Sequence, residues 1–323
     1  MMKFTIRTKN TSSSRDQLLT QEQAGASVLS ESLVGSAGAA MRTILHVPAR
    51  KRVNNRIFTL AVAIGAAAIL IAVIIAGMLC EGAASSADLA QKNLAPSFAH
   101  LFGTDNLGRD MFLRTIAGLS ISVRIGLVAA LVSSIIALIL GCLSALGPKK
   151  VDAFITWLVD LMLSVPHIVL LILISYALGK GFWGVSIGVA ITHWPALTRV
   201  VRAEVLQVKQ SGYVAVARKL GATPVEIARK HMLPAVFPQF IVGLILLFPH
   251  AILHEAAITF LGFGLPPEMP AIGVILSESM SYLSLGMWWS AVFPGVALLC
   301  IVLLFDLVGQ NVRRLIDPAH VQE

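Results

Sequence analysis

Long apolar runs that are almost free of charge, separated by short polar connections, constrain this chain more than any other feature. The first run, 57–80, has no charged residue and is long enough to cross the roughly 30 Å hydrocarbon core of a bilayer as a helix. Only 13% of the residues are charged, against about 25% in a soluble domain. We therefore predict an all-α membrane protein with six transmembrane helices. The expected spans are 57–80, 125–147, 153–178 (broken by Pro166), 182–198, 235–263 and 288–312.

The distribution of Lys and Arg predicts the orientation of these helices. With both termini in the cytoplasm, 20 of the 25 basic residues fall on the cytoplasmic side. The five expected outside are Lys92, Arg109, Arg114, Arg124 and Lys180. The net charge of +8 is thus explained by membrane sidedness, and we expect the lipid bilayer and no nucleic acid as a partner.

A basic, polar segment, Tyr213 to Pro234, lies between two apolar runs, and we call it the elbow. Its apolar residues recur at helical spacing and predict one apolar face. These residues are Val214, Ala217, Leu220 and Gly221. Pro224 is expected to begin a second short helix, and Pro234 to end it before the membrane. Two interpretations stay open: docking of a soluble partner, or an amphipathic connector at the lipid headgroups.

The elbow resembles the loop of bacterial ABC-importer permeases that reads E-A-A, three residues, G, nine residues, I, one residue, L-P. The matching positions are Ala217, Gly221, Leu233 and Pro234. The chain departs from the pattern at Ala215, Val216 and His231. The resemblance implies that ATPase subunits dock here, through Tyr213, Ala217, Arg218, Gly221, Ala222, Leu233 and Pro234.

Two further strings resemble the dipeptide, oligopeptide and nickel permeases, and in particular the second permease subunit. The string 102–118 is similar to the family's LGTDxxGRDxxSRxxxG signature, and 260–318 to its FLGLG, FPG and LDP ending. The matching residues are Phe102, Gly103, Thr104, Asp105, Gly108, Arg109, Asp110, Arg114, Gly118, Phe260, Leu261, Gly262, Gly264, Phe293, Pro294, Gly295, Gly309, Leu315, Asp317 and Pro318.

The resemblance implies a type I ABC importer permease (MetI-like) fold in a bacterial or archaeal inner membrane. Its expected partners are a second homologous permease, two ABC ATPases and an extracytoplasmic solute-binding protein. We expect a disordered cytoplasmic tail over 1–52, then the first transmembrane helix and an external linker over 53–100. The permease core follows over 101–323 and includes the coupling loop 204–234.

No GxxxxGK[ST] phosphate-binding loop occurs in the chain, so we expect no cofactor on it and ATP with Mg²⁺ on partner subunits. The chain is therefore expected not to be an enzyme. The resemblance allows di- or oligopeptides, nickel or metal chelates as the solute. An ion-coupled secondary transporter that works without an ATPase is the alternative.

Two histidines, His250 and His254, lie four residues apart and therefore on one helix face, with Glu255 adjacent. Imidazole suits nickel, cobalt, zinc and copper, so these residues are a candidate transient site for a metal or metal chelate. Hydrogen bonding between helices, or contact with the partner permease, is the alternative. No second histidine completes an HExxH zinc-protease motif after His254.

Overall fold

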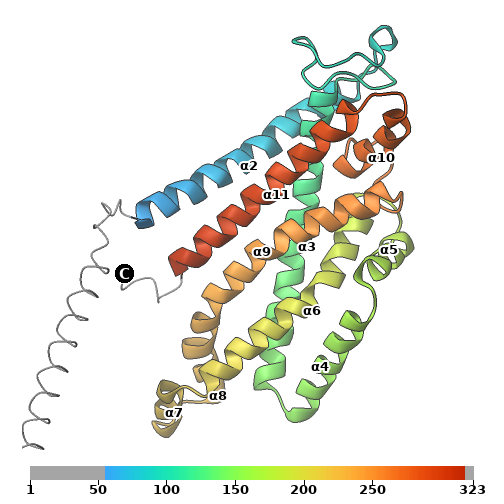
Figure 1. The fold of residues 1–323 in the computed structure, drawn as a ribbon. Coiled ribbons are helices and arrows are strands. Elements are labelled where there is room, and N and C mark those ends of the chain that lie inside the picture. The colour runs from blue at the N-terminus through green and yellow to red at the C-terminus, as the bar shows by residue number, and fades with distance from the viewer. Residues whose placement is uncertain (1–54, 317–323) are drawn as a thin grey trace, which may run out of the picture. The chain divides into compact units, whose positions relative to one another are not determined.

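The computed structural model describes residues 55–316, whose regular secondary structure is helical apart from one isolated bridge between Thr104 and Asp110 (Figure 1). The predicted tail 1–52 and the closing residues Asp317 and Pro318 lie outside this range. The helices are α2 (Asn55–Ser85), a 3₁₀ turn (Leu89–Gln91), α3 (Met111–Leu146), α4 (Lys149–Ser164), α5 (His167–Ala177), α6 (Phe182–Lys209), α7 (Gly212–Lys219), α8 (Pro224–Ile227), a π turn (Ala228–Met232), α9 (Leu233–Phe260), α10 (Ile272–Leu283) and α11 (Trp289–Ile316).

Within residues 55–316, four helical segments are long and apolar enough to cross a membrane: Phe58–Ser85, Met111–Leu146, Val225–Phe260 and Trp289–Leu315. The third expected span is bent by 96° between α4 and α5, at Pro166, and makes a fifth if the pair is one span. Helix α6 has 28 residues, which is long enough to cross a membrane, but its mean hydropathy is lower than that of the four segments above. The all-α membrane fold is confirmed, whereas the number of six spans stays a prediction.

Helix α6 is longer than expected, because it continues eleven residues past the predicted end at Thr198, to Lys209. Its polar extension is held by α4: the Arg202 guanidinium donates to both carboxylate oxygens of Asp152 at 2.7 Å, and Arg199 pairs with Asp160. Apolarity predicts only the part of a helix that meets lipid. Ion pairs let the helix extend beyond it.

Two further boundaries differ from the expectation. Helix α3 begins at Met111 rather than near 125, because the Asp110 carboxylate accepts hydrogen bonds from the backbone of Phe112 and Leu113 and caps the helix. Residues expected in a connection before the last span form α10, whose Ile272 and Ile275 are fully buried.

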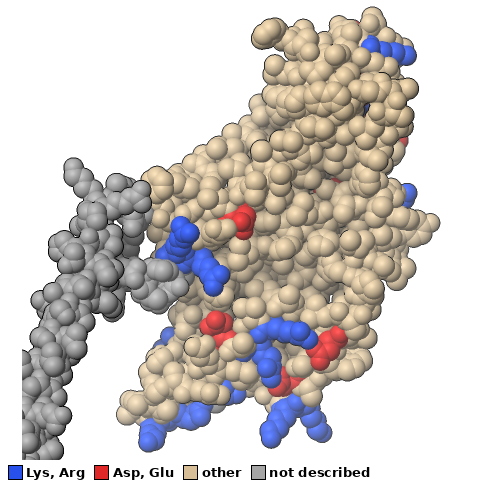
Figure 2. Space-filling model, in the orientation of Figure 1, with Lys and Arg blue, Asp and Glu red and all other residues tan. Residues whose placement is uncertain are grey.

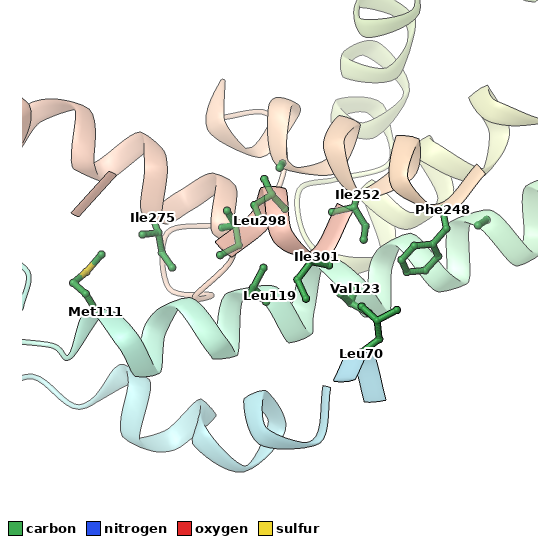
Figure 3. Close-up of a cluster of buried hydrophobic side chains, with 12 residues drawn as sticks. Leu70, Met111, Leu119, Val123, Phe248, Ile252, Ile275, Leu298 and Ile301 are labelled. Atoms are coloured by element: carbon green, nitrogen blue, oxygen red, sulfur yellow. The ribbon is translucent and has the colours of Figure 1, made fainter. Parts of the chain in front are cut away.

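Helix α3 is the central element, since it packs along α6 and α9 and also contacts α4, α10 and α11 (Figure 1). A buried apolar cluster joins it to α2, α9, α10 and α11 (Figure 3). Figure 3 shows this cluster around Leu119 and Val123 of α3, with Leu70, Ile252, Ile275 and Ile301 arriving from the surrounding helices.

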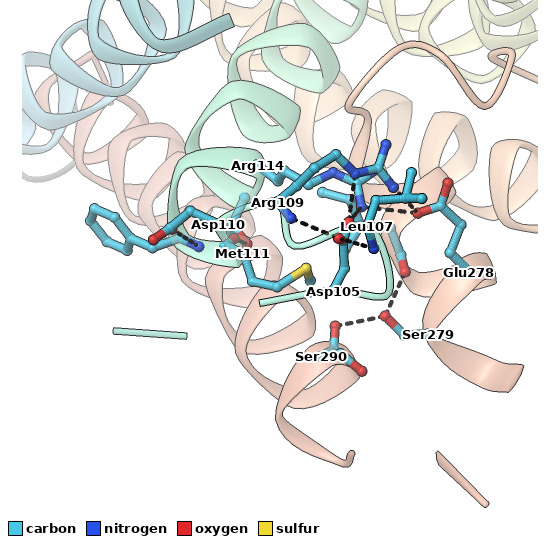
Figure 4. A network of polar contacts seen from close by, with 12 residues as sticks. Asp105, Leu107, Arg109, Asp110, Met111, Arg114, Glu278, Ser279 and Ser290 are labelled. Carbon is cyan, nitrogen blue, oxygen red and sulfur yellow. Dashed lines mark hydrogen bonds and ion pairs between the residues drawn. The ribbon is translucent and has the colours of Figure 1, made fainter. Parts of the chain in front are cut away.

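A buried ion network joins the segment before α3 to α10 (Figure 4). The Arg114 guanidinium, only 2% exposed, donates to Asp105 at 2.7 Å and to Glu278 of α10 at 2.9 Å. Arg109 donates to the same Asp105 oxygen at 2.6 Å. Gly108 closes the turn at φ +72°, where a Cβ would lie 1.7 Å from the Asp88 carbonyl oxygen. The Gly-Thr-Asp to Gly-Arg-Asp string therefore has a structural role, because its ion pairs hold the start of α3 against α10.

We expect Arg114→Met to lower the free energy of unfolding by about 3 kcal/mol, because it leaves Asp105 buried with one cation fewer. Unfolding by SDS in mixed micelles, followed by circular dichroism, measures the change. Lys92→Met is the matched control, because Lys92 is exposed in the same polar region, and its effect should stay within about 0.5 kcal/mol. Equal losses in the two variants would contradict a structural role for the network.

Candidate functional site

The elbow is an ordered helical unit. Helix α7 ends where the Gly221 N–H donates to the Arg218 carbonyl and the Ala222 N–H donates to the Ala217 carbonyl, both at 3.1 Å. This pair of bonds is a Schellman cap, and it requires the left-handed backbone of Gly221, whose φ is +88°. A glycine at this position therefore sets the angle between α7 and α8.

One side of the elbow is anchored in the helix bundle. Val214 of α7, Ile227 of α8 and Met232 of the π turn are at most 5% exposed and share an apolar cluster with Val205 of α6. The same cluster includes Val236 of α9. A displacement of the elbow therefore transmits directly to the helices on either side of it.

The opposite side of the elbow exposes large apolar side chains. Tyr213, Val216, Leu220 and Val225 are 50%, 56%, 82% and 76% exposed. Basic side chains border them at Arg218, Lys219, Arg229 and Lys230. Figure 2 shows Lys and Arg gathered at the end of the molecule where α7 and α8 lie.

The expectation of one apolar face on α7 is wrong in part. Val214 is buried, whereas Leu220 and Gly221 are exposed, because α7 ends at Lys219 and these two residues lie in its carboxy-terminal cap. Of the other predicted contact residues, Arg218 and Tyr213 are exposed. Ala217 and Ala222 are half-buried against the anchoring cluster.

Pro234 does not end the second elbow helix before the membrane, as the sequence had suggested. It lies in the first turn of α9 beside the exposed Leu233, and the π turn Ala228–Met232 leads α8 into α9 without a break. Because the helix continues without a break, the missing backbone N–H of Pro234 leaves one helical hydrogen bond unmade, at the point where the π turn passes into α9. The elbow is therefore continuous with a transmembrane helix.

A histidine cluster lies elsewhere in the bundle, where three helices meet. His167, His193 and His254 each place a ring nitrogen within 4.8 Å of the other two. They come from the start of α5, from α6 and from α9. We call these residues the histidine cluster.

The predicted grouping of His250, His254 and Glu255 does not come together. The exposed His250 lies outside the cluster, and its backbone carbonyl oxygen is 2.7 Å from Nδ1 of His254. Glu255 is fully buried, and one of its carboxylate oxygens accepts a hydrogen bond from the Thr259 hydroxyl at 3.0 Å. Adjacent positions on a helix point in different directions, so Glu255 cannot share a site with His254.

His167 and His193 were not predicted as site residues, because they are far from His254 along the chain. The sequence did contain one indication of their role. Each lies within an expected transmembrane segment, where an ionisable side chain is by default a candidate functional residue.

Comparisons with known proteins agree with the fold. Residues 133–320 match the family described as "Binding-protein-dependent transport system inner membrane component". A crystal structure of the MetNI methionine ABC transporter, described as inward facing, aligns with a TM-score of 0.55 and 20% identity over 64% of this chain and 98% of the matched chain.

Relatives identified by sequence are also permease proteins of transport systems. A putative peptide transport system permease protein of Brucella suis is 34% identical, covering 77% of this chain and 84% of the relative. The dipeptide transport system permease protein DppC of Bacillus subtilis is 32% identical, and the match covers 71% of this chain and 72% of the relative.

Together with the multi-pass helical fold, these matches identify a transport component of the membrane rather than an enzyme. The chain belongs to the family of binding-protein-dependent transport system inner membrane components, and it is a permease subunit of an ABC importer that works with an ATPase and a partner permease.

Proposed function

We propose that this permease imports di- or oligopeptides and is driven through its elbow. One observation carries the proposal: the elbow is anchored on one side by Val214 and Met232 and exposes Val216 and Leu220 on the other. Exposed apolar side chains with a polar rim are typical of a protein contact surface. A partner that grips this surface moves α6 and α9, which lie directly before and after the elbow.

The proposed partners follow from this arrangement. Two ABC ATPases bind ATP and Mg²⁺ and dock on the elbows of this chain and of a second homologous permease, while this chain holds no cofactor. An extracytoplasmic solute-binding protein delivers the solute. The concentration of Lys and Arg around the elbow supports a cytoplasmic position for it and for both termini, since basic residues favour that side.

Peptides are the favoured solute because the relatives from Brucella suis and Bacillus subtilis are named for peptide and dipeptide transport. Nickel or a metal chelate is the second candidate, and the histidine cluster is the observation that favours it. Ion-coupled transport without an ATPase has no support in the family assignment.

We expect Gly221→Arg to abolish ATP-dependent dipeptide uptake into proteoliposomes that carry the complete transporter. The glycine is exposed and the space around it is open, so the new side chain points at the docked ATPase, while the positive φ adds strain.

Gly286→Arg is the matched control for this variant. Gly286 also has a positive φ (+81°) and open space around it, but it lies in the turn between α10 and α11. If uptake stops for Gly221→Arg and persists for Gly286→Arg, the result supports the proposal that the elbow couples the ATPase to transport. Normal uptake by Gly221→Arg would overturn it.

A second pair of variants separates docking from folding. Val216→Asp changes a side chain that is 56% exposed, so we expect a folded protein that no longer copurifies with the ATPase. Val214→Asp introduces an unpaired charge at a fully buried position two residues away, so we expect the protein itself to be lost from the membrane. Immunoblots of membranes and of pulled-down ATPase measure both. Full ATPase recovery with Val216→Asp would contradict docking at this face.

A further inference from the structure

We propose that the histidine cluster binds a divalent first-row transition-metal ion through His167, His193 and His254. The three rings are stacked edge to face, with centroids 4.6, 4.6 and 5.0 Å apart. Imidazole is a common ligand for zinc, nickel, cobalt and copper. Three helices thus bring three ligands to one point.

The hydrogen bonds of two rings prepare them for a metal. The Nδ1 atom of His193 lies 2.8 Å from the Val189 carbonyl oxygen, and Nδ1 of His254 lies 2.7 Å from that of His250. A carbonyl oxygen only accepts, so each Nδ1 carries the proton and each Nε2 keeps its lone pair. Metal-binding histidines are oriented by the same kind of bond.

The third ring has a nitrogen that the protein leaves without a partner. Nε2 of His167 is buried and has no hydrogen bond within the described part of the chain. The Nε2 atom of His193 has only a long contact, 3.4 Å, with Nδ1 of His254. Buried polar atoms normally have partners, so these nitrogens point to a ligand.

The spacing of the ring nitrogens suits a metal after a small closure. Metal–nitrogen bonds of 2.0–2.1 Å in a tetrahedron place ligand nitrogens about 3.3 Å apart. One nitrogen of each ring lies within 4.8 Å of the other two, and a turn of the His254 ring would bring its Nε2, in place of Nδ1, toward Nε2 of His193.

Three histidines leave one coordination position for water or for a donor atom of the solute. Within residues 55–316 no carboxylate belongs to the cluster, so a bound dication keeps its full charge among apolar helices. That charge favours weak, exchangeable binding or binding together with an anionic donor such as a peptide carboxylate. A role in transport rests on the proposed function, whereas metal binding itself does not.

The test is direct metal binding by the full chain, purified with its partner subunits in nanodiscs and without a polyhistidine tag. Cobalt(II) is titrated and its d–d absorption recorded, and nickel and zinc are measured by equilibrium dialysis. We expect one ion per chain, and His167→Gln, His193→Gln and His254→Gln should each weaken binding at least about tenfold, a loss that even outer-shell changes produce.

His250→Gln is the matched control, because His250 lies one turn from His254 but outside the cluster. It should bind cobalt as the unmodified protein does. His167 is only half-buried, so His167→Gln remains informative if the buried His193→Gln fails to fold. Unchanged binding by a folded His167→Gln, or an equal loss in His250→Gln, would overturn the site.

Uptake assays then distinguish the source of the ion. If the metal is cargo, labelled nickel accumulates in vesicles, His167→Gln stops this accumulation and His250→Gln does not. If the metal is resident, chelation lowers dipeptide uptake and zinc restores it. Each outcome supports the site, and transport without metal binding in any assay would reject it while leaving the permease assignment intact.

Discussion

The bilayer core offers no water, and the whole architecture depends on satisfying polar groups inside the protein. The backbone does so by forming helices, and the side chains do so by pairing across them. Arg202 with Asp152 joins α6 to α4, and Arg114 with Asp105 and Glu278 joins the start of α3 to α10. These pairs lie toward the helix ends, where charge costs least, and they hold the two ends of the bundle in register.

The elbow has the opposite arrangement, since it leaves apolar side chains exposed at the surface of the chain. Leu220 and Val225 are exposed although Val214 and Ile227 of the same short segment are buried. Exposing apolar surface is unfavourable unless a partner covers it, and this is the physical basis on which we propose the elbow as the docking surface. The Schellman cap at Gly221 and the π turn before Leu233 stiffen the segment, and a stiff lever transmits force that a flexible loop would absorb.

The fold was largely predictable from the sequence because hydropathy is a local signal. The apolar runs located the long helices, and the three motifs indicated the family that the comparisons confirmed. Predictions failed where distant contacts decide. Helix α6 extends to Lys209 because α4 supplies Asp152 and Asp160 as partners, and α10 forms because α3 and α9 cover Ile272 and Ile275.

The sequence by itself determined an all-α permease of an ABC importer, because membrane length, charge asymmetry and family motifs are all written along the chain. Only the tertiary structure decided which histidines meet. The near-right-angle bend at Pro166 and the packing of α6 against α9 bring His167 and His193 to His254 and leave His250 outside. Spacing along one helix cannot reveal such a site, because the ligands come from three helices that fold together only through their long-range contacts.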